Sequence, residues 1–326
     1  MNKHDIHLVV VTGAGSGIGR ATALRFAADH AEVVCLDIDA QTARDTAAMI
    51  AERGGSARGY QLDVADADAY ELMATAIQTT HGVPDVVVNN AGIVAIGGTL
   101  THSVEDWRRV IDVNLSGVVH GCRLFGAQMS ARGEGGHLVN IGSLASYTPT
   151  ISGPSYCTSK AAVRMLSESL RAELASEGIG VSVICPGGIT TNLWGSADHL
   201  GVDAEQADDR NAVTLGFAKL AESLGAMYGP DSVATAIVRS VHHNWAVVPV
   251  RPEAWALYGL SRLSPELLRL GVRLTGENAV DTLTRMVEGS PAAALLRRFA
   301  GTPASEPDAV PVSSNGAGDP KLVAIS

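Results

Sequence analysis

The chain has 326 residues, of which 46% are hydrophobic and 18% are charged, and it carries a formal net charge of −10. This length allows one large domain or two small ones, and the hydrophobic fraction suits a large buried core. We expect no nucleic acid partner, because a phosphate-binding face needs clustered Lys and Arg, and no membrane-spanning helix, because no run of 18 apolar residues occurs.

Along the chain, short apolar runs rich in β-branched residues alternate with longer stretches of helical pattern. The strand-like runs are 7–11, 33–37, 57–64, 85–90, 137–142, 181–186 and 246–250, and the helical stretches lie near 18–29, 39–53, 66–80, 103–131, 154–177 and 231–243. Near-continuous apolar strands are typical of strands covered on both faces, and alternation with helices favours parallel pairing. The pattern predicts an α/β fold, a doubly wound parallel sheet of the Rossmann type with about seven strands and helices on both faces.

The sheet pattern is complete by residue 250, so we expect one Rossmann-type domain over 1–250, including a polar, irregular loop at 192–230. Residues 251–300 are helical in pattern and rich in Leu and Arg, and we expect a helical extension packed on the domain. Residues 301–326 are rich in Pro, Ser, Gly, Ala and Asp, which predicts a disordered tail.

The spacing of the cysteines indicates in which cellular compartment the protein is expected. Cys35, Cys122, Cys157 and Cys185 are scattered and form no Cys-x-x-Cys pair. We expect reduced core residues in a cytoplasmic protein, with neither disulfides nor a metal site. The first residues also lack the apolar core and small-residue cleavage site of a secretory signal.

A glycine-rich turn in "VTGAGSGIGR" (11–20) follows the first predicted strand and opens the first helix. Glycine lets the chain turn tightly and approach a pyrophosphate, which then lies on the helix N-terminus. The alternative is a glycine-rich turn without a ligand. We predict a dinucleotide site, with cofactor contacts from Gly13, Ser16, Gly17, Ile18 and Gly19.

Asp37 ends the second predicted strand, eighteen residues after Gly19. An acid there accepts hydrogen bonds from both hydroxyls of the adenosine ribose and repels a 2′-phosphate. No Arg follows it directly, since the next residues are Ile38, Asp39 and Ala40. The position favours NAD over NADP. The alternative is an acid that caps the next helix, and Asp39 is the better candidate for that role.

Tyr156 and Lys160 stand four residues apart on the predicted helix 154–177, so their side chains share a face. The chain has twenty arginines but only four lysines, so a lysine here is unusual. A tyrosine with the ordinary pKa of about 10 is a poor base near pH 7, but a nearby ammonium favours the phenolate and lowers that pKa. Such a tyrosine can exchange a proton with an alcohol or a carbonyl. An ordinary surface pair is the alternative.

Further polar residues follow the predicted strands, where the ligand crevice of a parallel sheet opens. Ser143 follows the fifth strand, thirteen residues before Tyr156, and Asn90 ends the fourth. Asn114 lies inside the long helix 103–131, where an amide is a mediocre helix former.

Together these motifs resemble the compact branch of the short-chain dehydrogenase/reductase family, over roughly residues 5–250. Each motif alone is weak, but their order and context are specific. The motifs that carry the resemblance are the glycine turn with Thr12, the run Asn90, Ala91 and Gly92, then Asn114, Ser143, Tyr156 and Lys160, and "PGGITT" at 186–191.

The resemblance implies a role for each of these residues. Tyr156 would be the general acid/base, and Ser143 would hold the substrate oxygen. Lys160 would bind the nicotinamide ribose and lower the tyrosine pKa, while Asn114 would hold a water that links Lys160 to solvent. Further cofactor contacts would come from Asp63 and Val64 at the adenine, and from Asn90, Ala91, Gly92, Pro186, Gly187, Ile189 and Thr191.

We therefore expect an NAD-dependent oxidoreductase that interconverts a secondary alcohol and a ketone. Its substrate pocket would contain Leu144, Ala145, Ser146, Tyr147, Gly187, Gly188, Leu193 and Trp194. No Arg or Lys stands among these, which favours an apolar substrate over a carboxylate or phosphate. The alternatives are a ketone or acyl reductase that works in the reductive direction, a catalytically silent dinucleotide-binding sensor or scaffold, and a sugar-nucleotide epimerase or dehydratase.

The segment after the last strand departs from the family pattern and leaves the assembly open. We expect a homodimer through the helices 103–131 and 154–177, or a homotetramer. The segment 252–275 has three interpretations: a helical pair packed on the body or across a dimer, a lid over a lipophilic substrate, or an amphipathic helix in weak contact with a membrane surface.

Overall fold

The computed structural model describes residues 6–96, 98–100, 102–148, 153–187, 198–199 and 229–266. All of them lie in the first of two compact units, Met1–Leu274. Among these residues, no helix combines the length and apolarity needed to cross a bilayer.

The first half of the unit alternates strands and helices. Its elements are β1 (Leu8–Thr12), α1 (Gly17–Ala28), β2 (Glu32–Asp37), α2 (Ala40–Glu52), β3 (Ser56–Gln61), α3 (Ala67–Thr80) and β4 (Val86–Asn89). A short strand, β5 (Ala95–Ile96), pairs with β8 (Asp198–His199), and neither was predicted. Two-residue strands carry no periodicity that a sequence pattern could reveal.

The second half continues the alternation with longer helices. It contains α4 (Val104–Ile111), the π-helical turn η1 (Asp112–Ser116), α5 (Gly117–Arg132), β6 (Gly136–Ile141), the 3₁₀ turn η2 (Leu144–Ser146), α6 (Pro154–Glu173), the 3₁₀ turn η3 (Leu174–Glu177), β7 (Ile179–Pro186), α8 (Pro230–His243), β9 (Val247–Val250) and α9 (Pro252–Leu263). The predicted helix 103–131 is therefore divided, while 154–177 ends at Gly178 in the left-handed conformation.

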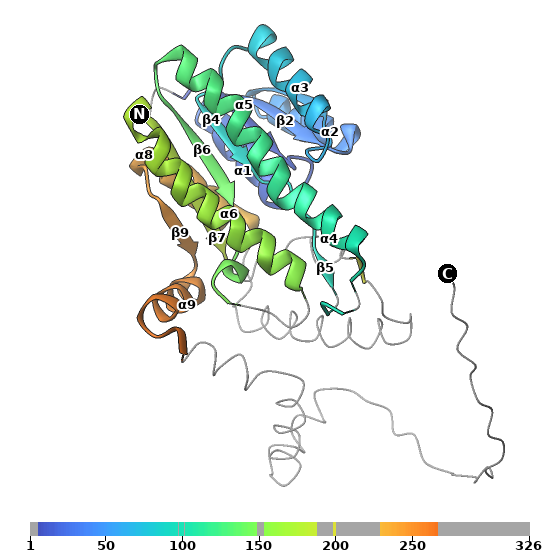
Figure 1. The fold of residues 1–326 in the computed structure, drawn as a ribbon. Helices are drawn as coiled ribbons and strands as arrows, with labels where there is room; N and C mark the ends of the chain where they lie inside the picture. The colour runs from blue at the N-terminus through green and yellow to red at the C-terminus, as the bar shows by residue number, and fades with distance from the viewer. Residues whose placement is uncertain are drawn as a thin grey trace, which may run out of the picture. The chain divides into compact units, whose positions relative to one another are not determined.

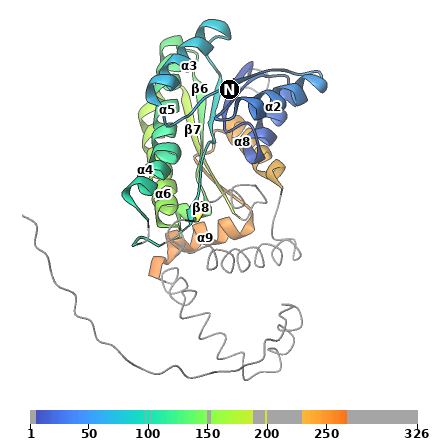
Figure 2. The same ribbon diagram turned by 90° about the vertical axis from the view of Figure 1, so that its right-hand side faces the viewer.

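The strands form a seven-stranded sheet in the order β3-β2-β1-β4-β6-β7-β9, and every pairing is parallel. Helices cover both faces (Figures 1 and 2): α3, α5 and α6 lie on one face and α1, α2 and α8 on the other. The strands at the centre are buried along their length, as continuous apolar runs predict. The predicted doubly wound parallel sheet is confirmed.

The described part of the C-terminal segment contributes one helix, α9, which packs against β9 and against the η2 turn. The remainder of the predicted extension 251–300 and the predicted tail 301–326 lie outside the described residues.

Candidate active site

The sheet changes its direction of growth between β1 and β4, which are neighbours although two strands separate them in the sequence. Ligands of open parallel sheets bind outside the carboxyl ends of the strands at such a point. A cavity of about 340 Å³ lies there. Its lining includes Gly13, Ser16, Gly17, Ile18, Asp37, Asp63, Val64, Asn90, Ala91, Gly92, Ser143, Tyr156, Lys160, Pro186 and Gly187.

The glycine turn is held closed by contacts that leave no room for side chains. Gly13 has φ +63°, and a Cβ at Gly19 would lie 2.0 Å from the carbonyl oxygen of Gly13. Gly19 does not appear in the cavity lining, so it serves the packing of the turn. Asn90 ties β4 to the turn, because its Nδ2 donates to the carbonyls of Thr12 at 2.9 Å and Gly13 at 3.1 Å.

The start of α1 differs from the starts of its neighbours. Ser16, its N-cap residue, is extended and makes no side-chain capping bond. The α2 and α3 helices are capped instead by the carboxylates of Asp39 and Asp66. The first amides of α1 therefore face the cavity without a capping side chain, as a site for a pyrophosphate requires.

Asp37 and Asp39 make different contacts, and Asp39 caps the helix α2 as the sequence predicted. Asp39 accepts bonds from the amides of Gln41 and Thr42 in the first turn of α2. Asp37 lines the cavity, and its Oδ2 accepts a bond of 2.8 Å from the Gly15 amide. The nearby Arg20 is tied to the Gly15 carbonyl and to the Thr46 hydroxyl.

Tyr156 and Lys160 lie on the first turns of α6, and both side chains are buried at the cavity wall. Ser143, which follows β6, lies close enough to Tyr156 for its side chain to lower the pKa of the tyrosine hydroxyl. Burial raises the pKa of the Tyr156 hydroxyl to about 12, and the Ser143 side chain acts in the opposite direction. The predicted low tyrosine pKa is therefore not the net result here, because burial is the larger effect.

The Lys160 ammonium donates to the Ile141 carbonyl at 2.9 Å and lies 5.7 Å from the centre of the Tyr156 ring. Burial lowers the pKa of Lys160 to about 8. A charge this close to the phenol stabilises its ionised form. The two predicted partners are therefore neighbours in the fold as well as in the helix.

Asn114 lies in the π-helical turn η1 and is buried. Its Oδ1 accepts from the Ile93 amide at 2.8 Å, and its Nδ2 donates to the Ile93 carbonyl at 2.9 Å and to Ser159 Oγ at 3.1 Å. The amide thus joins the loop after β4 to α6. A π-bulge inside an α-helix frequently marks a functional site, and no helical periodicity reveals one in advance.

The predicted substrate residues fall into three groups. Leu144, Ala145 and Ser146 form η2 and, with Tyr147, do not appear in the cavity lining. Ser146 instead donates to the Lys160 carbonyl at 2.9 Å and accepts from the Ser143 amide at 3.2 Å. Gly187 lines the cavity. Gly188, Leu193 and Trp194, with the cofactor candidates Ile189 and Thr191, lie outside the described residues.

The sequence prediction missed a part of the wall. Ile38, Leu62, Ile93, Val113, Ile141 and Gly142 also line the cavity. They are mostly apolar residues at strand ends, and nothing in their type separates them from the core. In the described part of the chain, no group of three or more His, Cys, Asp or Glu side chains is placed to hold a metal ion.

The sequence and the fold both match known oxidoreductases. The family model for short chain dehydrogenases matches residues 7–199. The probable oxidoreductase EphD of Mycobacterium tuberculosis is 52% identical over 269 residues, which cover 82% of this chain and 45% of EphD. The chain therefore spans about half the length of this relative. The 3beta-hydroxysteroid dehydrogenase 1 of Eggerthella lenta is 35% identical over 67% of this chain and 83% of its own length.

Two solved structures of similar fold contain a nicotinamide dinucleotide. A short chain dehydrogenase/reductase from Burkholderia phymatum in complex with NAD has a TM-score of 0.72 and 29% identity, covering 83% of this chain and 97% of its own. A metagenomic short-chain oxidoreductase in complex with NADP has a TM-score of 0.60 and 28% identity. The match covers 75% of this chain and 95% of the oxidoreductase. The chain belongs to the short-chain dehydrogenase/reductase family, oxidoreductases with a nicotinamide dinucleotide as cofactor.

Proposed function

We propose that this protein is an NAD-dependent dehydrogenase that interconverts a secondary alcohol and a ketone, with Tyr156 as the general acid/base. The observation that carries the proposal is that Ser143, Tyr156 and Lys160 line the same cavity, with the Lys160 ammonium 5.7 Å from the centre of the Tyr156 ring. This arrangement offers one proton donor and acceptor and one group that orients an oxygen.

The cavity residues fit a nicotinamide dinucleotide. The closed glycine turn and the uncapped start of α1 suit a pyrophosphate, and Asp37 suits the hydroxyls of the adenosine ribose. Asp63 and Val64 would line the adenine, Asn90 the middle of the cofactor, and Lys160 the nicotinamide ribose, with Ile189 and Thr191 predicted at the carboxamide. When bound, the nicotinamide supplies direct hydride transfer.

The protein groups handle the proton and the position of the substrate. Ser143 holds the substrate oxygen against Tyr156, which takes the hydroxyl proton during oxidation and returns it during reduction. Burial makes the phenolate costly, and the Ser143 side chain acts against that effect. We propose that the nearby charge of Lys160 is also needed to bring Tyr156 into use near neutral pH. Asn114, in turn, fixes Ile93 near Lys160, where a water relay to solvent would pass.

The preference for NAD rests on Asp37. Its carboxylate lines the cavity and is already held by the Gly15 amide, so it cannot turn away from the ribose without losing that bond. A 2′-phosphate there would meet a fixed negative charge at short range. The other acid nearby, Asp39, is occupied by its helix cap.

We propose an apolar substrate, in the broad class of terpenoid, steroid or aromatic alcohols. Among the residues that line the described cavity, Lys160 is the single cation, and it is committed to the catalytic pair. The similarity to a 3beta-hydroxysteroid dehydrogenase supports the same class. The free cysteines support a reducing compartment, the cytoplasm. The exposed side chains of Val119 on α5 and Met165 on α6 support a homodimer through these helices.

The test is NADH formation by the purified protein with 2-propanol, 1-phenylethanol, borneol and a 3β-hydroxysteroid, each run with NAD and with NADP. We expect turnover with NAD and an apolar alcohol. Tyr156→Phe should lose at least about 100-fold in kcat and still bind NADH. A Tyr156→Phe variant as active as the wild type would overturn the mechanism. Binding of NADH with no turnover in either direction would favour the sensor or scaffold alternative.

A further inference from the structure

The helix α9 follows the last strand of the sheet and lies against the turn that carries the catalytic serine. It contacts both β9 and η2. The centre of the Tyr258 ring is 5.2 Å from that of Tyr147, with the planes inclined by 59°. The Trp255 ring also contacts Tyr258 in an edge-on arrangement, with the ring centres 6.1 Å apart. The contact is thus aromatic, and such pairs are selective in geometry.

Tyr147 transmits this contact to Ser143 through a few bonds. The Tyr147 amide donates to the Leu144 carbonyl at 3.0 Å, and the Ser146 amide donates to the Ser143 carbonyl at 2.9 Å. Ser143 Oγ accepts from the Ala145 amide at 3.1 Å. Only three residues separate Ser143 from Tyr147, so the tyrosine belongs to the same hydrogen-bonded turn as the serine.

The inner end of Tyr147 is buried. Its hydroxyl has no hydrogen-bond partner among the described residues, and the residue packs against the core cluster that contains Cys185 of β7. Tyr147 therefore extends from its contact with α9 to the packed core on that face of the sheet. This position allows α9 to set the placement of a reacting group that it does not contact.

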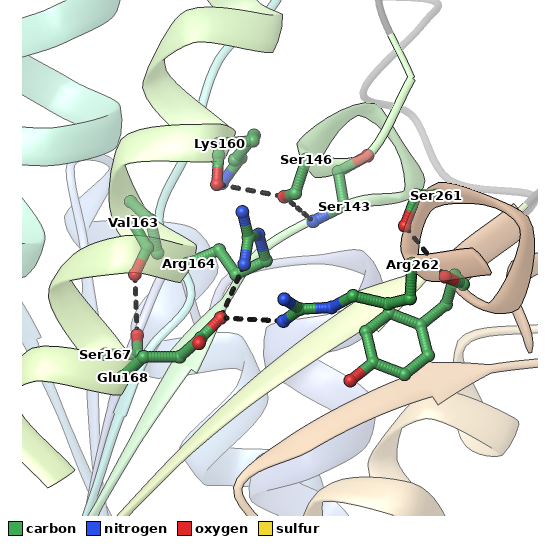
Figure 3. A network of polar contacts seen from close by, with 10 residues as sticks. Ser143, Ser146, Lys160, Val163, Arg164, Ser167, Glu168, Ser261 and Arg262 are labelled. Carbon is green, nitrogen blue, oxygen red and sulfur yellow. Dashed lines mark hydrogen bonds and ion pairs between the residues drawn. The ribbon is translucent and has the colours of Figure 1, made fainter. Parts of the chain in front are cut away.

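Charged groups reinforce the aromatic contact. Glu168 on α6 pairs with Arg164 on the same helix and with Arg262 on α9, whose Nη2 lies 3.7 Å from Glu168 Oε1. Figure 3 shows Glu168 between the two guanidinium groups. Arg164 also lies 5.7 Å from the centre of the Tyr147 ring, and Arg262 lies 5.5 Å from that of Tyr258. Each arginine thus joins the carboxylate to one of the two rings.

We propose that Tyr258 is a positioning residue for the catalytic serine, and that Tyr258, Arg262, Tyr147, Arg164 and Glu168 form a clamp between α9 and the catalytic turn. The clamp holds Ser143 Oγ at the hydroxyl of Tyr156. The inference rests on the proposed function, because it assigns the clamp an effect on Ser143 and Tyr156. It gives α9 a role in the reaction although none of its described residues appears in the cavity lining.

The first test compares Tyr258→Ala with Tyr258→Phe and with Leu263→Ala, which removes a side chain that is 89% exposed at the end of the same helix. Hydrogen exchange of the peptide over 143–148, followed by mass spectrometry, requires no substrate. We expect faster exchange there in Tyr258→Ala, with exchange over β1 and α1 unchanged. Tyr258→Phe keeps the ring and should match the wild type, as should Leu263→Ala.

The second test is kinetic, with the best alcohol from the panel above. Tyr258→Ala should lower kcat about tenfold, since small misplacements of a reacting group are costly, while the Kd for NADH stays within about twofold. Its pH–rate profile should move to higher pH, as loss of the effect of Ser143 requires. In a Ser143→Ala background, Tyr258→Ala should have no further effect on kcat.

Glu168→Gln provides a second variant that removes the charge shared by both arginines and keeps the aromatic contact. Glu168→Gln should speed hydrogen exchange over 143–148 and lower kcat, as Tyr258→Ala does, but both changes should be smaller. Unchanged exchange and kcat in both variants would overturn the inference and leave the proposed function intact. An additive effect of Tyr258→Ala on Ser143→Ala would also overturn it. Failure of the proposed function would show itself separately, as an active Tyr156→Phe.

Discussion

The ammonium of Lys160 and the carbonyl oxygen of Ile141 are joined by a buried hydrogen bond of 2.9 Å. Ile141 ends β6, and Ser143 stands two residues beyond it, so the bond links α6 to the strand that precedes Ser143. Gly92 lies beside this bond, because a Cβ there would come within 3.4 Å of the ammonium and 3.3 Å of Asn114 Oδ1. The lysine therefore fixes position as well as charge.

Replacement of Lys160 by arginine should not preserve activity. The guanidinium is larger and planar, and the buried space beside Gly92 suits a compact ammonium. We expect kcat to fall at least about 100-fold, measured as NADH formation. Thermal unfolding and NADH binding serve as controls for the fold. A Lys160→Arg variant with near wild-type kcat would contradict the assigned geometry.

Loss of the Ser143 hydroxyl should change the pH dependence of oxidation. The Ser143 side chain lowers the tyrosine pKa, and burial alone raises it. Ser143→Ala removes the first effect and keeps the second, so the tyrosine ionises at a higher pH. In a plot of kcat against pH, the rising limb should shift to higher pH, and kcat on the plateau should be lower. A limb that stays in place, or moves to lower pH, would show that another group governs it.

Asp37 and Asp39 allow a matched comparison, because they are two residues apart and differ in what they contact. Asp37→Ser with Ile38→Arg should raise the ratio of NADP to NAD in kcat/KM at least about tenfold, since a repulsive charge is replaced by an attractive one. Asp39→Ala should leave that ratio unchanged and cost about 1 kcal/mol of stability through the lost cap. The assignment of cofactor preference to Asp37 would be refuted if Asp39→Ala changed the ratio of NADP to NAD and the Asp37 variant did not.

His137 should make the protein sensitive to acid. Burial lowers its pKa from 6.5 to about 3, and its Nε2 lies 2.8 Å from Ser182 Oγ. Between these two pH values the unfolded chain binds a proton that the folded protein refuses, so stability is lost as the pH falls. The slope from this one group approaches about 1.4 kcal/mol per pH unit.

The measurement is the free energy of unfolding at pH 7 and pH 4.5 for the wild type, His137→Gln and His243→Gln. Glutamine can keep a hydrogen bond to Ser182 but cannot take up the proton, so His137→Gln should show the shallower decline. His243 is exposed, and its variant should follow the wild type. Equal slopes in all three proteins would exclude His137 as the source.

The sequence alone was sufficient to predict the strands and helices and to identify several residues of the candidate site. Apolar runs such as 85–90 must be covered on both faces, and this local rule is sufficient to predict a parallel sheet with helices on both sides. The glycine turn, Tyr156 and Lys160 were also identifiable, because glycine conformations and i,i+4 spacing are properties of short segments. Asp37 and Asp39 could be separated for a similar reason, since a cap lies directly before its helix.

The tertiary structure decided what depends on residues far apart in the chain. The pairing of Asn114 with Ile93 and Ser159, the contact of Tyr258 with Tyr147, and the packing role of Gly19 have no signature in a local pattern. The sign of the Tyr156 pKa shift also changed, because burial comes from the whole fold, whereas the sequence shows only the neighbouring charge. Local periodicity encodes which faces are buried, and only the folded chain fixes which groups meet there.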